Sequence, residues 1–402
     1  MYDVIISGSG PSGSIAGETA ARAGLKVLIF ERHKLDPRFE KPCGGSVPKH
    51  VWDEFNLPPN KISERKINGN MMIAPNNNNF VLRSEPNFGW NVKRSVFDKF
   101  LADRAIDSGA EILEESFVKD IIVENDFVKG VVVKTPDGIK EFRSKITIAA
   151  DGVGSRIVPK SGIRNNWKRE ELGFCAVAFV KGYKGLDGEF SINLFYLSNE
   201  IAPNAYAWVF PFSEDLANVG LGLFKSKGNP MDYLYKFLKW PRIKKQFKET
   251  NIIWKSNFPI PIQGISKKLY KNGFMGVGDA VGFVSPIIGE GISYGMTSGK
   301  LAAETAIDAI EKGDFSASGL KKYKSKLRKE NLFTIFSAHK IFRDLLMDDL
   351  NNIVNALINL ASSNSDVQKL IKLALTEEGV DDIPPELMTK ILNLIRNVLK
   401  KD

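Results

Sequence analysis

Residues 2–13 read YDVIISGSGPSG, a short apolar run that leads directly into a glycine-rich turn. The turn has the spacing G-x-G-x-x-G, formed by Gly8, Gly10 and Gly13. In such a turn the first glycine permits the tight bend, the second lets the backbone approach a pyrophosphate, and the third lets the next helix pack close to the strand. The N-terminus of that helix faces the phosphate charge. The stretch therefore predicts a strand, a phosphate-binding turn and a helix.

The sequence after this turn completes the pattern of a dinucleotide-binding unit. A helix-like stretch over 14–23 precedes a second apolar run over 26–30, and Glu31 follows it. Glu31 lies eighteen residues after Gly13, where a carboxylate can accept hydrogen bonds from both ribose hydroxyls. A glycine turn in an ordinary strand–helix–strand unit is the alternative. The acid at this spacing favours the dinucleotide.

Composition limits the class of protein. The chain has 402 residues, 43% of them hydrophobic and 26% charged, which predicts two or three coupled globular domains. The two cysteines, Cys43 and Cys175, do not suggest a disulfide framework and favour a cytoplasmic location. We expect no leader peptide before the strand at residue 2, and no apolar run approaches the roughly eighteen residues that a membrane helix needs. The three histidines are scattered, so no metal site is expected.

The net charge of +9 suits an anionic membrane surface, a phosphorylated substrate or an acidic electron-transfer protein. Nucleic acid is not expected as a partner, because the sequence contains no recognised nucleic-acid module. Basic amphipathic stretches at 320–329 and 387–398 could contact anionic lipid. For each stretch alone, an ordinary packed helix with a solvated basic face is favoured.

Two later turns pair a glycine with an acid after an apolar run. Asp151-Gly152 follows the run over 146–150, and Gly278-Asp279 follows the run over 274–277. Open α/β sheets bind their ligands at the carboxyl ends of such strands. We therefore expect one sheet to be assembled from distant segments, with a second domain inserted between them.

These three segments resemble the FAD-binding segments of the para-hydroxybenzoate hydroxylase-like flavoproteins. The resemblance implies that the first turn holds the ADP part of FAD, that Asp151-Gly152 lies near the pyrophosphate, and that Gly278-Asp279 contacts the ribityl chain. It also implies that Arg94 contacts FAD and that the backbone of Val118 meets the adenine. A surface cation at a helix start is the alternative for Arg94, although the helix dipole disfavours positive charge there.

Two further motifs resemble those of the geranylgeranyl reductase family. The first is KPCGG at residues 41–45, and the second is YAWVFP at residues 206–211, followed by G-x-G at 220–222. The resemblance covers nearly the whole chain to about residue 320. It implies an FAD-dependent reductase that saturates C=C bonds of geranylgeranyl chains, with archaeal ether phospholipids as the favoured substrates. Glu290 departs from the archaeal pattern and is more typical of the chlorophyll branch, which stays open.

The resemblance also assigns roles to individual residues. The implied substrate contacts are Tyr206, Trp208, Phe210, Pro211, Gly220 and Gly222. Cys43 is a candidate catalytic thiol beside the flavin, although a small buried residue in a tight loop is an equal alternative. The implied cofactor contacts are Gly8, Gly10, Gly13, Ser14, Glu31, Arg32, Pro42, Cys43, Gly44, Gly45, Arg94, Val118, Asp151, Gly152, Gly278, Asp279, Gly289, Gly291 and Ile292.

The implied reaction requires hydride from reduced flavin and a proton for an alkene that no carbonyl polarises. It also requires an apolar tunnel, for which the aromatic residues between 174 and 212 are candidates, with a sheet core as the alternative for most of them. The electron donor stays open among NADPH, ferredoxin and another reductant. A flavin-dependent monooxygenase or halogenase and a non-enzymatic flavin-binding factor are the other candidate functions.

The expected fold is α/β. A Rossmann-like FAD-binding domain is built from the discontinuous segments 1–60, 91–160 and 263–312. An antiparallel-sheet substrate domain comprises residues 61–90 and 161–262, and a helical C-terminal region covers residues 313–402. We expect the protein in the cytoplasm, with peripheral contact at the inner face of the cell membrane.

Overall fold

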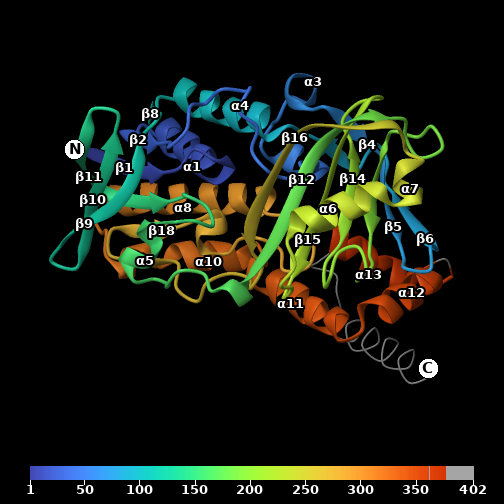
Figure 1. Ribbon diagram of the computed structural model, residues 1–402. Coiled ribbons are helices and arrows are strands. Elements are labelled where there is room, and N and C mark those ends of the chain that lie inside the picture. The colour runs from blue at the N-terminus through green and yellow to red at the C-terminus, as the bar shows by residue number, and fades with distance from the viewer. Residues whose placement is uncertain (362, 377–402) are drawn as a thin grey trace. The chain divides into compact units, whose positions relative to one another are not determined.

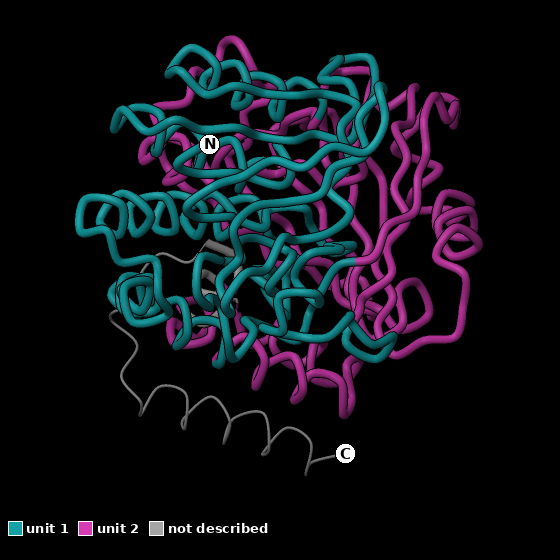
Figure 2. The backbone as a smooth tube through the Cα atoms, turned by 90° about the vertical axis from the view of Figure 1, so that its left-hand side faces the viewer, with its two compact units in different colours: residues 1–40, 95–171, 260–337 teal, residues 41–94, 172–259, 338–402 magenta. Residues whose placement is uncertain are grey.

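The computed structural model describes residues 1–361 and 363–376. The chain forms two compact units, and each is assembled from three separate stretches (Figure 2). Unit 1 comprises residues 1–40, 95–171 and 260–337, and unit 2 comprises residues 41–94, 172–259 and the part from 338 onward. The predicted domains differ from these units at residues 41–60 and 91–94, which fall in unit 2, at residues 161–171, which fall in unit 1, and in the C-terminal region, which is divided between the units after residue 337. Residues 41–60 belong with unit 2 because strand β3 (Ser46–Pro48) pairs with β7 (Gly89–Asn91).

Unit 1 is built on a mainly parallel sheet. Strands β18, β11, β1, β2 and β8 pair in parallel, and β1, β2 and the second half of β11 are apolar and buried, as is typical of a parallel sheet. The strand order is β17–β18–β11–β1–β2–β8. The bounds are β1 (Tyr2–Ser7), β2 (Val27–Phe30), β8 (Glu111–Leu113), β11 (Gly138–Ala149), β17 (Tyr270–Lys271) and β18 (Phe274–Gly276). The predicted return of the segment near 276 to the first sheet is thus confirmed.

Helices and a hairpin complete unit 1. Helix α1 begins with Pro11 at its first position, where a missing N–H costs nothing, and it packs against α8 (Figure 1). Strands β9 and β10 form an antiparallel extension on the first half of β11. The bounds are α1 (Pro11–Arg22), α4 (Arg94–Asp107), β9 (Phe117–Glu124), β10 (Phe127–Thr135), α5 (Ile157–Ser161), α8 (Ile292–Lys312), α9 (Ala317–Leu320) and α10 (Lys322–Lys329), with 3-10 turns at Arg169–Glu171 and Gly278–Val281.

Unit 2 is built on a second sheet, with the strand order β16–β12–β15–β14–β13–β5–β6. One pairing departs from the predicted antiparallel sheet, because β13 and β5 run parallel. These two strands come from different stretches of the chain, so no tight hairpin sets their direction. The bounds are β5 (Gly69–Ile73), β6 (Asn79–Arg83), β12 (Leu172–Tyr183), β13 (Ile192–Tyr196), β14 (Ala207–Pro211), β15 (Leu216–Phe224) and β16 (Phe247–Pro261).

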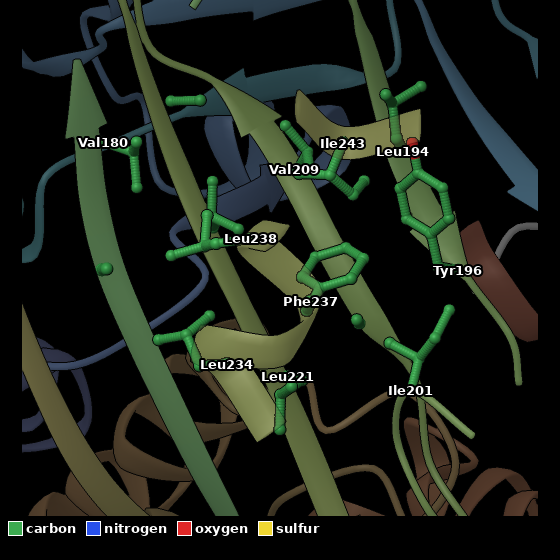
Figure 3. Packing of buried hydrophobic residues seen from close by; sticks show 14 of the residues in the cluster. Val180, Leu194, Tyr196, Ile201, Val209, Leu221, Leu234, Phe237, Leu238 and Ile243 are labelled. Carbon is green, nitrogen blue, oxygen red and sulfur yellow. The ribbon is translucent and has the colours of Figure 1, made fainter. Parts of the chain in front are cut away.

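One face of this second sheet is covered by α6 (Pro230–Lys239) and α7 (Pro241–Lys244). Asn229 caps α6 by accepting a hydrogen bond from the Met231 N–H, and Leu234, Phe237 and Leu238 turn inward from the helix (Figure 3). They pack on strand residues such as Val180, Val209 and Leu221. This face of the sheet is a closed core.

Smaller elements complete unit 2. A three-stranded sheet in the order β3–β7–β4 lies beside two short helices, and later helices continue the chain. The bounds are α2 (Lys49–Glu54), α3 (Pro59–Ile62), β4 (Arg65–Ile67), α11 (Leu332–Asp348), α12 (Leu350–Ala361) and α13 (Ser365–Thr376). The predicted helical region is thus observed through residue 376, and the amphipathic stretch at 387–398 lies outside the described residues.

The other basic stretch, 320–329, is a packed helix. Tyr323 and Leu327 of α10 are buried, and the Tyr323 hydroxyl donates to the Gly276 carbonyl at 3.1 Å. Two of its lysines form ion pairs within unit 1, Lys322 with Asp308 and Lys326 with Glu304. The alternative of an ordinary packed helix therefore holds for this stretch.

Candidate active site

The first glycine turn is held by backbone contacts that leave no room for side chains. The Gly8 N–H donates to the Phe30 carbonyl at 2.8 Å. A Cβ on Gly13 would lie 1.9 Å from the Gly8 carbonyl oxygen, whereas a Cβ on Gly10 would meet nothing within 4 Å. The backbone therefore fills the space beside Gly13 and leaves the space beside Gly10 open. The open side at Gly10 is where the sequence predicts the pyrophosphate.

Glu31 is buried and joined to this turn. One carboxylate oxygen accepts hydrogen bonds from the Ser9 N–H at 3.1 Å and the Ser9 hydroxyl at 2.9 Å, and the other accepts from the His33 N–H at 3.0 Å. Ser14 donates its hydroxyl to the Ser9 carbonyl at 2.8 Å. Each carboxylate oxygen has further acceptor capacity, so Glu31 can still receive ribose hydroxyls. Arg32 is exposed.

Val118 is brought toward Glu31 by the main chain. The Ser116 N–H donates to the Glu31 carbonyl at 2.8 Å, and β9 begins one residue later. Val118 itself is buried at the start of that strand. The structure thus places the predicted adenine-contacting segment beside the acid that is predicted to hold the ribose.

The second turn joins the first directly. The Ala150 N–H donates to the Ser7 carbonyl at 2.9 Å, and a Cβ on Gly8 would lie 2.4 Å from the Ala150 carbonyl oxygen. Asp151 accepts the Arg156 N–H through Oδ2 at 3.1 Å, while its Oδ1 is buried and has no partner among the described residues. Burial raises the pKa of Asp151 to about 6. A Cβ on Gly152 would meet open space.

The third turn also packs on the first helix. A Cβ on Gly278 would lie 2.3 Å from the Ser12 hydroxyl oxygen, and the Gly278 N–H donates to the Ser298 hydroxyl at 3.0 Å. Gly291 lies close to Asp279, since a Cβ on Gly291 would be 3.3 Å from the Asp279 Oδ1. Gly289 and Ile292 flank this segment, and Ile292 begins α8. The three predicted turns therefore meet within unit 1.

Glu290 has a structural role in this segment. Its carboxylate accepts the Ser293 N–H at 2.8 Å and the Ser293 hydroxyl at 2.6 Å, which caps the start of α8. Burial raises the pKa of Glu290, and the nearby Asp279 adds to the shift. The cap accounts for Glu290 without a role in substrate choice.

Arg94 is the first residue of α4 and is half-buried. Sequence reasoning missed the acid that caps this helix. The Glu40 carboxylate accepts the Ser95 N–H at 3.2 Å and the Ser95 hydroxyl at 2.8 Å. A carboxylate at a helix N-terminus offsets the unfavourable position of the arginine. No local pattern links residues 40 and 95, so the pairing was invisible in the sequence.

Unit 2 brings the two family motifs together. The Cys43 carbonyl accepts a hydrogen bond from the Asn218 side chain at 2.8 Å, and Asn218 accepts the indole N–H of Trp208 at 2.8 Å. A Cβ on Gly44 would lie 3.2 Å from the Phe210 ring, and a Cβ on Gly220 would lie 2.2 Å from the Trp208 ring. Both glycines thus make room for aromatic side chains.

A second polar network holds the end of the YAWVFP motif. Asn91 donates to the Pro211 carbonyl at 2.8 Å and to the Asn193 side chain at 2.9 Å. Asn193 in turn donates to the Ser46 hydroxyl at 2.9 Å. Gly45 completes the loop, because its carbonyl accepts the Val92 N–H at 2.7 Å. Pro42 precedes this loop and is half-buried.

Aromatic side chains form a wall on the sheet face opposite α6. Trp208 and Phe210 alternate on β14, and Tyr206 directly precedes the strand; the ring centroids are 6.0 Å apart for each neighbouring pair. Val177, Phe195, Trp254 and Phe258 pack with them, and Trp254 and Phe258 were not predicted. Tyr196 and Phe190 belong to the opposite core, as the sheet-core alternative expected.

The two cysteines differ in their surroundings. Cys43 is half-buried, and its Sγ accepts the Gly45 N–H at 3.3 Å. Cys175 is buried opposite Gly222 in the strand pairing, and burial raises its pKa to about 12, with the nearby Cys43 adding to the shift. Cys43 is therefore the more accessible of the two thiols.

Comparisons with known proteins agree with this arrangement. A family model described as FAD dependent oxidoreductase matches residues 3–180, and one described as geranylgeranyl reductase catalytic domain matches residues 176–256. A digeranylgeranylglycerophospholipid reductase of Methanosarcina acetivorans is 34% identical over 91% of this chain and 87% of its own length. The chain belongs to the geranylgeranyl reductase family. It is an FAD-dependent oxidoreductase.

Solved structures show the same fold. A geranylgeranyl bacteriochlorophyll reductase-like protein from Thermoplasma acidophilum superposes with a TM-score of 0.83 at 28% identity, covering 98% of this chain and 99% of its own. A flavin-dependent brominase superposes with a TM-score of 0.73 at 22% identity, covering 100% of both chains. The second likeness shows that this family of reductases shares its fold with a halogenase.

The residues of unit 1 fit FAD. Gly10 and Gly152 leave open space where a Cβ would stand, and Asp151 Oδ1 is a buried polar atom without a partner among the described residues. The N-terminus of α1 lies directly after the open turn and favours an anion. Glu31 has acceptor capacity left for hydroxyls. The donor set and the shape thus suit a dinucleotide.

We expect Gly10→Ala to separate cofactor binding from folding. Its φ of −64° suits alanine, and the added methyl meets no protein atom, so the cofactor-free variant should unfold at the wild-type temperature. FAD affinity should fall by at least about tenfold, measured by flavin fluorescence titration, because the methyl occupies the predicted pyrophosphate position. In Gly13→Ala, by contrast, the stability itself should fall. Wild-type FAD affinity in Gly10→Ala would contradict this placement.

A pH dependence is expected from Asp151. Its pKa in the folded protein, about 6, lies above its ordinary value of 3.8, so its stabilising contribution is present below pH 3.8 and is lost as the pH rises through 6. Between pH 4 and 7 the cofactor-free protein should therefore lose about 2 kcal/mol relative to Asp151→Asn, measured by urea unfolding. Asp137→Asn, at an exposed turn, is the control. A pH-independent difference would contradict the burial argument.

Proposed function

We propose that the protein saturates C=C bonds in the geranylgeranyl chains of archaeal-type ether phospholipids. The observation that carries the proposal is the aromatic wall of unit 2, an apolar cluster in which the rings of Tyr206, Trp208 and Phe210 contact one another. The reductase of Methanosarcina acetivorans, whose name specifies a digeranylgeranylglycerophospholipid, supports this substrate class. The match of residues 176–256 to the catalytic-domain model supports the assignment of the wall to the substrate.

FAD and the aromatic side chains have different proposed roles in the reaction. FAD, when bound and reduced, supplies the hydride. The aromatic wall holds the prenyl chain and excludes water from it, since Trp208 and Phe210 are buried and contact further rings. Gly220 and Gly222 leave the neighbouring strand β15 without side chains at these two positions.

Cys43 is the proposed proton-holding residue at the edge of this wall. Its thiol accepts a hydrogen bond from the Gly45 N–H, which fixes the direction of Sγ. A half-buried thiol can hold a proton in surroundings where a carboxylate would be costly to bury. The alternative, a small residue that only fills a tight loop, predicts that Cys43→Ser and Cys43→Ala have the same activity as the wild type.

The brominase has a similar fold, and its name specifies a different reaction. Monooxygenase or halogenase activity is therefore the alternative. Reduction in the chlorophyll branch is a further alternative for the substrate. Glu290 caps the start of α8, which accounts for its side chain by a structural role. The name of the Methanosarcina acetivorans relative favours the archaeal lipid.

The test is anaerobic turnover of a geranylgeranyl phospholipid by dithionite-reduced protein, followed by mass spectrometry. The product should gain two hydrogens for each double bond reduced, and Trp208→Ala should lower this rate by at least about tenfold because it removes most of the chain-binding surface. A hydroxylated or halogenated product on exposure to oxygen, with no gain of hydrogen under anaerobic conditions, would favour the monooxygenase or halogenase.

We infer that electrons reach FAD from an external reductant, with NADPH, ferredoxin and another donor as candidates. The only complete dinucleotide fingerprint found in the sequence, Gly8 to Glu31, is assigned to FAD. The net charge of +9 suits an acidic protein donor. Stopped-flow flavin reduction with each donor in turn identifies it.

We also propose peripheral contact with the membrane that holds the lipid. Within residues 1–361 and 363–376, no helix is both long and apolar enough to cross a bilayer. Cosedimentation should increase with the anionic lipid content of vesicles and decrease with salt, because the protein is basic. Equal binding to neutral and anionic vesicles would contradict an electrostatic contact.

A further inference from the structure

Asn218 connects two segments that the proposed reaction uses. It lies on β15 and is 1% exposed. Its Oδ1 accepts the indole N–H of Trp208 at 2.8 Å, and its Nδ2 donates to the Cys43 carbonyl at 2.8 Å. One side chain thus joins the aromatic wall to the loop that carries the candidate thiol. No motif in the sequence singled out this residue.

The orientation of the Asn218 amide is fixed by chemistry. An indole N–H can only donate and a peptide carbonyl can only accept, so a flipped amide would lose both bonds. Each of the three groups would otherwise have to be desolvated without a partner, which costs free energy in a buried site. The bridge therefore holds the Trp208 ring and the Cys43 peptide in one relative position.

Because the Cys43 loop is closely packed, the position of the Cys43 peptide also determines where the thiol lies. Gly44 directly follows Cys43, and a Cβ on Gly44 would lie only 3.2 Å from the Phe210 ring. The next residue, Gly45, donates its N–H to Cys43 Sγ and accepts the Val92 N–H through its carbonyl. A shift of the Cys43 peptide would therefore move both the thiol and its contact with the wall. The Asn218 bond is the polar tie that opposes such a shift.

We propose that Asn218 is a positioning residue for the reduction, acting through Trp208 and Cys43 without touching the reacting atoms. This rests on the proposed function, since the wall and the thiol are its assigned parts. We expect the kcat of alkene reduction to depend on both the Oδ1 and the Nδ2 of Asn218. The affinity for the prenyl chain should depend mainly on the rings of the aromatic wall.

The first variant is Asn218→Asp, which has nearly the same shape. Its carboxylate can still accept the Trp208 N–H, but above its pKa it has no donor for the Cys43 carbonyl. Two measurements are made on the FAD-loaded protein: the rate of Cys43 alkylation by iodoacetamide, and kcat and KM for the lipid. Peptide mapping separates Cys43 from the buried Cys175.

For Asn218→Asp we expect Cys43 alkylation to change by at least about threefold and kcat to fall by at least about tenfold, with KM changing by less than about threefold. At lower pH the protonated carboxyl regains a donor, so the variant should recover toward the wild type. Flavin reduction by dithionite should stay at the wild-type rate. This pH-dependent recovery is not expected from a variant that has only lost stability.

Matched variants locate the effect. Trp208→Phe removes the indole donor together with part of the ring and should leave Cys43 alkylation near the wild-type rate, because Asn218 still bonds to the Cys43 carbonyl. Asn70→Asp places the same substitution at another buried asparagine of the sheet, on β5, and controls for a buried carboxyl. If Asn218→Asp does not fold, Asn218→Ser, which is too short to bridge both partners, replaces it without the pH arm.

The outcomes are separable. Wild-type alkylation and kcat in the Asn218 variant would overturn the positioning role, and so would equal effects in Asn70→Asp. If the wild-type protein itself does not reduce the lipid, the proposed function fails, while the alkylation rates still test whether Asn218 fixes the Cys43 loop. A rise in KM with unchanged kcat would assign Asn218 to chain binding and overturn the proposal.

Discussion

The close approach of main chain to main chain around the first turn is the constraint on which unit 1 depends. Gly13 packs on the Gly8 carbonyl, Gly8 packs on the Ala150 carbonyl, and Gly299 packs on the Ser12 carbonyl, in each case at distances that exclude a Cβ. The second and third of these contacts join segments that are more than a hundred residues apart in the chain. They place the ends of β1, β11 and β18 together, so that the open sides of Gly10 and Gly152 belong to one unit.

The sheet of unit 2 carries an apolar cluster on each face, and we propose that one of them binds the substrate. Strand alternation separates the two clusters. Val209 of β14 faces the core under α6, while Trp208 and Phe210 on the same strand form the aromatic wall. The buried amides of Asn91, Asn193 and Asn218 satisfy backbone carbonyls and side chains at the edge of this wall. Polar bonds thus fix the geometry of a surface whose own contacts are apolar.

Much of unit 1 could be predicted because its signals are local. A strand, a glycine turn and an acid at fixed spacing identify the cofactor segment, and the later Asp151-Gly152 and Gly278-Asp279 turns follow the same logic. The parallel pairing of β5 with β13 could not be predicted, since it joins distant stretches. The Glu40 cap and the Asn218 bridge were missed for the same physical reason. Each is a long-range hydrogen bond, and one sequence contains no pattern that reports it.

The aromatic residues show where composition alone fails. Alternation predicted that they divide between two faces, but the sequence could not say which face is closed by helices. Tyr196 and Trp208 are both aromatic residues of strands. Tyr196 packs against Phe237 of α6, whereas Trp208 belongs to the cluster on the other face of the sheet. The assignment of each ring required the position of α6.

Hydrogen–deuterium exchange of the protein with and without FAD tests most directly whether three distant turns form one cofactor site. Backbone amides in residues 8–14, 151–156 and 278–292 should all gain protection on FAD binding, in proportion to occupancy, while α6 should not change. Protection confined to residues 8–14 would contradict the account, because it would mean that the later turns are parts of the fold without being parts of the site.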